Sequence, residues 1–205
     1  MNYLDYIMGI LNEAVKASFP CENTRILGVA QAVRVEVQST TQGVQKAKIV
    51  PGVYVGNGDV EYSGFDDRYQ LCSYHKAINM SSRRVPGSGY GHEQSRIALT
   101  HNMSLVICAD VDRMGKDAGQ IALDIQFKFP DLLKANRLPE GFYSVAFNVT
   151  GMTLNAEQVF REEFQNENYF LGPQHALLKV NYAIESVLNK RCFPANCEPQ
   201  ELQTC

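Results

Sequence analysis

Hydrophobic residues recur at helical spacing near the start of the chain. Over residues 2–17 the spacing is close to i, i+3, i+4, i+7, which is typical of one face of an amphipathic helix. Pro20 ends this segment, because proline cannot continue a helix. We therefore expect a helix whose apolar face packs on another element. The apolar positions are Tyr3, Ile7, Ile10, Leu11, Ala14 and Val15.

Alternation of apolar and polar residues then predicts strands. Valines alternate with other residues over 32–37, the pattern of a half-buried strand. A second extended run covers 46–55, where Pro51 favours an edge or bent strand because it lacks a backbone N–H. Residues 56–59 (GNGD) predict a tight turn. Another strand is expected over 69–78.

The second half of the chain contains the strongest strand pattern. Residues 98–111 and 142–149 predict strands. Between them, Ile121, Ile125 and Phe129 are four apart and predict a helix over 115–129, ended by Pro130. Two segments stay open: 156–164 fits a short helix or a strand, and 174–189 starts as a strand of uncertain extent.

The order of these elements, a helix, strands, a second helix and further strands, predicts an α+β fold. We expect a mainly antiparallel sheet with the two helices on one face. Residues 79–94 show no periodicity and predict a long loop or hairpin tip. We expect one domain over 1–190, in which 56–96 is a loop or hairpin elaboration. Residues 191–205, with Pro and Cys, predict a loosely ordered tail.

Composition changes this picture little. The 205 residues are 45% hydrophobic and 20% charged, which excludes a disordered or fibrous chain. A net charge of −3 argues against non-specific nucleic-acid binding as the main function. The first 19 residues lack the pattern of a secretory signal, and no apolar run approaches the ~18 residues of a membrane span. We expect a soluble protein made in the cytosol.

The six cysteines do not form a metal-binding pattern. Cys72 and Cys108 lie in strand-like runs and are expected to be buried. Cys192, Cys197 and Cys205 crowd the tail, but no second closely spaced pair completes a zinc site. We expect structural or incidental thiols, with a disulfide in the tail as the less favoured alternative.

Candidate catalytic groups are few. Residues 87–91 (GSGYG) lack the preceding strand and following helix of a phosphate loop. Asp110, Asp112 and Asp117 are explained more simply as helix caps than as a metal or acid–base site. The four histidines, His75, His92, His101 and His175, form no local motif. We predict no catalytic residues, no cofactor and no metal.

One cationic stretch stands out in the Gly-rich segment 79–96. Arginine is well suited to phosphate and carboxylate recognition. A solvated loop explains the stretch, and so does a loop that contacts a neighbouring subunit or DNA. The candidate interaction residues are Arg83, Arg84, Tyr90, His92 and Arg96.

Three segments together resemble the tail terminator and tail-completion proteins of tailed bacteriophages, which include head–tail connector rings. The segments are NMSLVICADVDRMGKDAGQIALDIQFKF (102–129), FYSVAFNVTG (142–151) and HALLKVNYAIE (175–185). The resemblance lies in the order of elements over about residues 2–190. The chain is longer than the simplest members, as are subunits of the stacked rings in short tails of crAss-like phages.

The resemblance implies a structural virion protein rather than an enzyme. It implies a cyclic homo-oligomer, a hexamer or larger, that contacts portal, adaptor and tail proteins while genomic DNA passes through its lumen. That this DNA passes without specific binding is expected from the mild negative charge of the chain, not from the resemblance. The resemblance implies no membrane partner and a place at the head–tail junction or in the tail. Two alternatives remain: a monomeric binding module that uses residues 79–96, and a soluble enzyme with a site assembled across the sheet.

Overall fold

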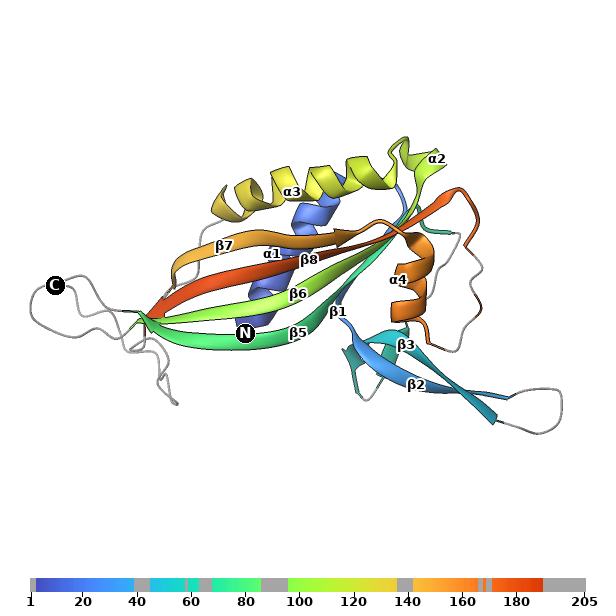
Figure 1. Cartoon of the computed structure of the whole chain (residues 1–205), viewed down its shortest axis with the longest axis horizontal. Helices are drawn as coiled ribbons and strands as arrows, with labels where there is room; N and C mark the ends of the chain where they lie inside the picture. Colours follow the sequence, from blue (N-terminus) through green and yellow to red (C-terminus); the bar gives the residue numbers. More distant parts are fainter. Residues whose placement is uncertain are drawn as a thin grey trace, which may run out of the picture.

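The computed structural model describes residues 3–38, 45–57, 59–62, 68–85, 96–135, 142–165, 168 and 171–189. Over these residues the chain forms a five-stranded sheet, a separate three-stranded sheet and four helices (Figure 1). This confirms the expected α+β class, with a mainly antiparallel sheet and two helices on one face. The predicted tail (191–205) lies outside the described residues, as do residues 86–95.

The larger sheet has the strand order β1–β5–β6–β8–β7. β1 runs parallel to β5, and every other neighbouring pair is antiparallel. Three of the strands are 15 residues long. They extend well beyond α4 and the smaller sheet, which pack near one end of them. The strands are β1 (Thr24–Val29), β5 (Leu71–Val85), β6 (Arg96–Asp110), β7 (Phe142–Thr153) and β8 (His175–Asn189).

Two helices, α1 (Tyr3–Ser18) and α3 (Ala118–Ala135), cover one face of the larger sheet. The ring of Phe147 on β7 stacks on that of Tyr182 at 4.8 Å and meets that of Phe129 on α3 at 5.6 Å. Burying each such side chain contributes about 1.5–3 kcal/mol to folding. The helix residues fully buried here include Ile7, Leu11, Val15, Ile121, Ile125 and Phe129.

Among the described residues, the opposite face is covered at the end where β5 begins and β6 ends. There α4 (Ala156–Glu163) buries Val159 and Phe160 against a second cluster that contains Cys72 and Cys108. The predicted burial of these two thiols is confirmed. The three-stranded sheet lies beside α4 and is antiparallel throughout; its strands are β2 (Gln31–Gln38), β3 (Gln45–Gly56) and β4 (Asp59–Tyr62).

The prediction of a helix over 115–129 is wrong at its start. A one-turn helix, α2 (Val111–Met114), comes first, and its N-cap Asp110 accepts a hydrogen bond from the Arg113 N–H. Gly115 then adopts a left-handed φ of 62°, which glycine reaches without strain. Asp117 and Gln120 exchange side-chain-to-backbone hydrogen bonds at the start of α3. Asp110 and Asp117 therefore are helix caps, as expected.

The three proline predictions have different outcomes. Pro20 follows the end of α1 at Ser18, as expected. Pro130 does not end its helix, because α3 continues to Ala135, so that prediction is wrong. Of the two alternatives for Pro51, an edge or a bent strand, the edge strand is wrong, because β3 is the central strand of the smaller sheet. Pro51 is tolerated because β4 pairs with β3 only from Gly52 onward, so β2 is the only described strand beside it.

The structure resolves the segments that the sequence left open. Residues 156–163 are helical, and β8 stays extended to Asn189. Of the two alternatives for 79–94, a long loop or a hairpin, the structure shows the hairpin, because β5 continues to Val85 and pairs with β6 as far as Arg96. Periodicity fails there because residues 77–84 are exposed on both faces, so no alternation is selected.

His75 on β5 is completely buried beneath α1. Its Nδ1 lies 2.7 Å from the Tyr182 hydroxyl, and its Nε2 lies 3.2 Å from Asn12 Oδ1 on α1. Since an amide oxygen only accepts, Nε2 carries the proton and Nδ1 accepts from Tyr182. Burial disfavours the charged ring and lowers the pKa of His75 to about 4.

This burial predicts a pH-dependent stability. The neutral ring is favoured only in the folded chain, so the unfolded chain binds the extra proton as the pH falls below the ordinary histidine pKa of about 6.5. The free energy of unfolding should fall by about 2 kcal/mol between about pH 7 and pH 5. His75→Gln, which keeps a donor and an acceptor but does not titrate, should remove most of that dependence in urea denaturation, and His101, whose pKa burial also lowers, should account for a smaller remainder. If the free energy of unfolding of the variant fell equally between about pH 7 and pH 5, groups other than His75 would be the cause of the dependence.

Candidate assembly surfaces

The predicted interaction residues lie at the far end of the β5–β6 hairpin. Arg83 and Arg84 end β5, and Arg96 begins β6, where it is the Cα partner of Val85. The structure thus brings these three arginines to one end of the larger sheet (Figure 1). Tyr90 and His92 lie outside the described residues.

The hairpin end is a weaker anion site than the sequence suggested. Arg83 donates to the Glu185 carboxylate of β8 at 2.6 Å, so one of the three positive charges is compensated. Both side chains of this pair reach solvent, and such a pair stabilises the fold little. Nothing in the sequence indicated Glu185, because 102 residues separate it from Arg83.

The same hairpin leaves a strand edge open. β1 pairs with β5 only from Leu71 to His75, and the last bond runs from the Ala30 N–H to the His75 carbonyl at 2.7 Å. Beyond His75 no described strand lies along the outer edge of β5. The side chains of residues 77–84 are exposed, including the apolar Ile78 and Met80.

The ladder register shows which backbone groups face outward. The Asp110 N–H donates to the Gln70 carbonyl at 2.9 Å, so even-numbered residues of β6 direct their backbone groups toward β5. Ser81 lies opposite Thr100 and is therefore bonded within the sheet. Ser82, the next residue, directs its N–H and C=O away from β6.

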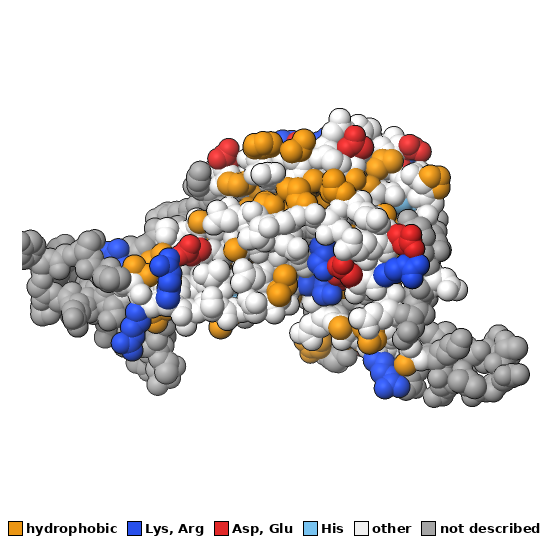
Figure 2. Space-filling model, viewed as in Figure 1, with side chains coloured by type: hydrophobic (Ala, Val, Ile, Leu, Met, Phe, Trp, Pro, Cys, Tyr) orange, Lys and Arg blue, Asp and Glu red, His pale blue; other side chains and the backbone are white. Residues whose placement is uncertain are grey.

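Two exposed apolar surfaces lie elsewhere on the molecule. We call the first the sheet patch: it is the part of one face of the smaller sheet where Tyr54 and Tyr62 are exposed beside the partly exposed Val33 and Val60. Val35 and Val50 of the same face pack in the second buried cluster. The second, the helix stripe, is formed by Leu123 and Phe127 on the outer side of α3. Hydrophobic side chains gather over both regions in Figure 2, at α3 and over the smaller sheet. The sequence pattern did not reveal the helix stripe, because the regular spacing of Ile121, Ile125 and Phe129 marks only the buried side of α3.

A buried ionic cluster holds α4 on the sheet. The carboxylate of Glu163 is fully buried and accepts from Lys76 at 2.8 Å, from Lys179 at 3.2 Å and from the Tyr74 hydroxyl at 3.2 Å. Burial and the neighbouring Glu163 raise the pKa of Tyr74. Burial opposes the charge on Lys179, but Glu162 and Glu163 overcome it and raise the pKa of Lys179. Both groups therefore keep their protons at neutral pH and are not poised for acid–base chemistry.

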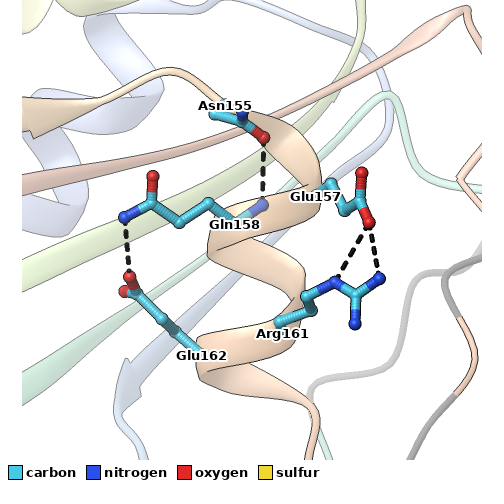
Figure 3. Close-up of a pocket in the computed structure, with 5 residues that line it drawn as sticks. All are labelled: Asn155, Glu157, Gln158, Arg161 and Glu162. Atoms are coloured by element: carbon cyan, nitrogen blue, oxygen red, sulfur yellow. Dashed lines mark hydrogen bonds and ion pairs between the residues drawn. The ribbon is translucent and has the colours of Figure 1, made fainter.

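An open concavity of about 420 Å³ runs along α4 (Figure 3). Its polar side chains pair with one another. The Arg161 guanidinium donates to Glu157 at 2.6 and 3.0 Å, and the Gln158 amide donates to Glu162 at 3.0 Å. Asn155 caps the helix by accepting from the Gln158 N–H. The lining offers no nucleophile with an adjacent base.

The remaining candidate metal-binding and catalytic residues do not form a common site among the described residues. Among the described residues no group of three or more His, Cys, Asp or Glu side chains is placed to hold a metal ion. Cys72 and Cys108 are buried, and the three tail cysteines lie outside the described residues, as do His92 and 87–91. No helix within the described ranges is long and apolar enough to cross a membrane.

Comparison with known proteins adds no further information on function. No protein-family model matches the chain, and no curated protein matches it in sequence.

A matched pair of proline variants tests the open edge. Ser82→Pro removes an N–H that points outward and should lower the free energy of unfolding little, whereas Ser81→Pro removes a ladder bond to Thr100 and leaves its carbonyl unpaired. We expect Ser81→Pro to cost about 1–3 kcal/mol more than Ser82→Pro in urea denaturation of dilute protein. Equal costs would mean that the outer edge is covered.

Proposed function

We propose that this chain is a structural subunit of a ring that joins head or portal components to tail components in a tailed-phage virion. The subunit acts through protein contacts and catalyses no reaction. Its partners are copies of itself in a closed ring, together with portal, adaptor and tail proteins. Double-stranded DNA passes through the lumen without specific binding.

The observation that carries this proposal is the open outer edge of β5 beyond His75. An uncovered strand edge presents unpaired backbone groups and is a place where another chain adds. Natural proteins usually shorten, cover or distort such an edge unless it is used. Here the register shifts once, between Ala77 and Asn79, but β5 then continues in register with β6 to Val85. Exposed Ile78 and Met80 lie along this edge.

The order of elements supports the placement in a phage tail. A first helix and strands precede β6, which leads through α2 into α3, and β7 and β8 complete the sheet. This is the order on which the resemblance to tail terminator and tail-completion proteins rests.

The electrostatics support passage of DNA without retention. Affinity for DNA rises with the number of cations that neutralise phosphates. The chain has a net charge of −3, and Arg83, Lys76 and Lys179 are each paired with glutamates of the chain itself. Few cations are left on this side of the sheet to hold a polyanion.

The positions of the exposed surfaces support two kinds of protein contact. The hairpin with the open edge forms one end of the elongated molecule, whereas the helix stripe and the sheet patch belong to elements on opposite sides of the larger sheet (Figure 1). The helix stripe and the sheet patch contact neighbouring subunits of the ring. The hairpin end contacts the next protein of the head–tail junction.

The mass of the purified chain in solution tests the proposal. Native mass spectrometry and negative-stain electron microscopy should show a closed ring of identical subunits, because heterologous contacts close when the rotation between neighbours allows it. A chain that stays monomeric at high concentration and never joins a virion particle would contradict the ring. A monomer that instead binds a partner, and loses it when Arg83 and Arg84 are changed to Ala, would support a binding module.

A further inference from the structure

Two of the three cysteines that the structure describes face each other across neighbouring strands. Cys72 of β5 is the Cα partner of Cys108 of β6, and both belong to the buried cluster that contains α4. Partners in an antiparallel pair direct their side chains to the same face of the sheet. The two thiols therefore lie side by side, although residues 73–107 separate them along the chain.

The register of the ladder gives the separation of the two backbones at this point. The Asp110 N–H donates to the Gln70 carbonyl at 2.9 Å, and Cys108 and Cys72 lie two residues along each strand from that pair. They therefore form a hydrogen-bonded pair, whose Cα atoms are about 5.5 Å apart in an antiparallel sheet. A disulfide requires about 4.4–6.8 Å between Cα atoms. The backbone thus already has the spacing that a bond between the two sulfurs needs.

The Cβ atoms of such a pair are further apart than a relaxed disulfide allows. Cross-strand Cβ atoms lie about 4.5–5.5 Å apart, at the longer end in a hydrogen-bonded pair, whereas a disulfide holds them at about 3.5–4.5 Å. Closing the bond must therefore draw the two strands together by about 1 Å at this pair. A disulfide under strain is reduced more readily than a relaxed one. The bond is therefore expected to be reversible.

Both cysteines remain accessible to a small oxidant. Each keeps 8% of its surface exposed, whereas the next pair on the same face, Tyr74 and Val106, keeps 3% and 1%. Oxidation of a thiol depends on its exposure and on its thiolate fraction. Hydrogen peroxide is small and uncharged, so it reaches this narrow opening more easily than a bulky disulfide does.

We infer that Cys72 and Cys108 are a redox-sensitive pair, which hydrogen peroxide converts to a disulfide and which a dithiol returns to two thiols. One thiolate attacks a peroxide oxygen, the O–O bond breaks, and water leaves after taking up a proton, which gives a sulfenic acid. The second sulfur attacks the sulfenic sulfur, the S–O bond breaks, and a second water leaves. The two thiols lose two electrons and two protons, and the peroxide becomes two waters.

The bond would join β5 to β6 at the packed end of the larger sheet. That end anchors the hairpin whose outer edge is open. Thiols stay reduced in the cytosol, and a subunit of a released virion leaves that reducing environment. The bond would then form after assembly. This timing rests on the proposed function, whereas the chemistry of the pair does not.

The test uses the full chain with Cys72 and Cys108 as its only cysteines. Hydrogen peroxide is added to the folded protein, and mass spectrometry measures the intact mass. The mass should fall by two hydrogen atoms with no gain of oxygen, and peptide mapping should place the bond between Cys72 and Cys108. Dithiothreitol should then restore both thiols. The residues changed to serine are Cys21, Cys192, Cys197 and Cys205.

A matched control moves one thiol along the same face of β6. Cys108→Ala combined with Val106→Cys keeps two thiols, but positions 72 and 106 are diagonal neighbours about 7–8 Å apart, too far for a disulfide. This control should gain oxygen instead of closing a bond. Circular dichroism before and after oxidation establishes that each protein is folded.

Two results would overturn the inference and leave the ring proposal unaffected. The first is a chain with Cys72 and Cys108 that keeps both thiols in peroxide or only gains oxygen. The second is a control that closes its bond as fast as this chain, since the register of the ladder would then not determine the reaction.

Discussion

The unequal coverage of three long strands determines most of this structure. β5, β6 and β8 are each 15 residues long, but α4 and the smaller sheet cover one of their faces only near the start of β5. Residues 71–75 of β5 are therefore buried, and residues 77–84 are exposed. On the opposite face, the core that contains α1 and α3 continues along β8 as far as Ile184. The long strands thus have a firmly packed end and an end that is open to other molecules.

The packed end explains why the open end remains ordered. β6 lies between β5 and β8 along its whole length, so the ladder carries the geometry of the core into the hairpin. The buried His75 and the Glu163 cluster fix α1 and α4 on opposite faces at this end. Burial of a charge and of a polar ring is costly, but each is satisfied by specific partners that a displaced helix would lose.

Local patterns in the sequence predicted most helices and strands, and failed where long-range context decides. Residues 32–37 and 142–149 alternate because one face is buried, whereas 79–85 have no alternation because both faces of that stretch are exposed. Pro130 lies inside α3, which continues to Ala135, and Pro51 is tolerated because β4 pairs with β3 only from Gly52 onward. Of the candidate residues, Arg83, Arg84 and Arg96 were predicted to lie together. Glu185 and Glu163 were not, because Arg83 and Lys76, which they pair with, are distant in sequence.

The central claim is that copies of this chain join into a closed ring through protein contacts. The most direct measurement is a cryo-electron microscopy reconstruction of the oligomer that the purified chain forms. The account predicts a closed ring of identical subunits that meet through unlike surfaces, with the β5–β6 hairpins together at one end of the ring. A chain that stays monomeric, or a two-fold dimer in which like surfaces meet, would contradict it.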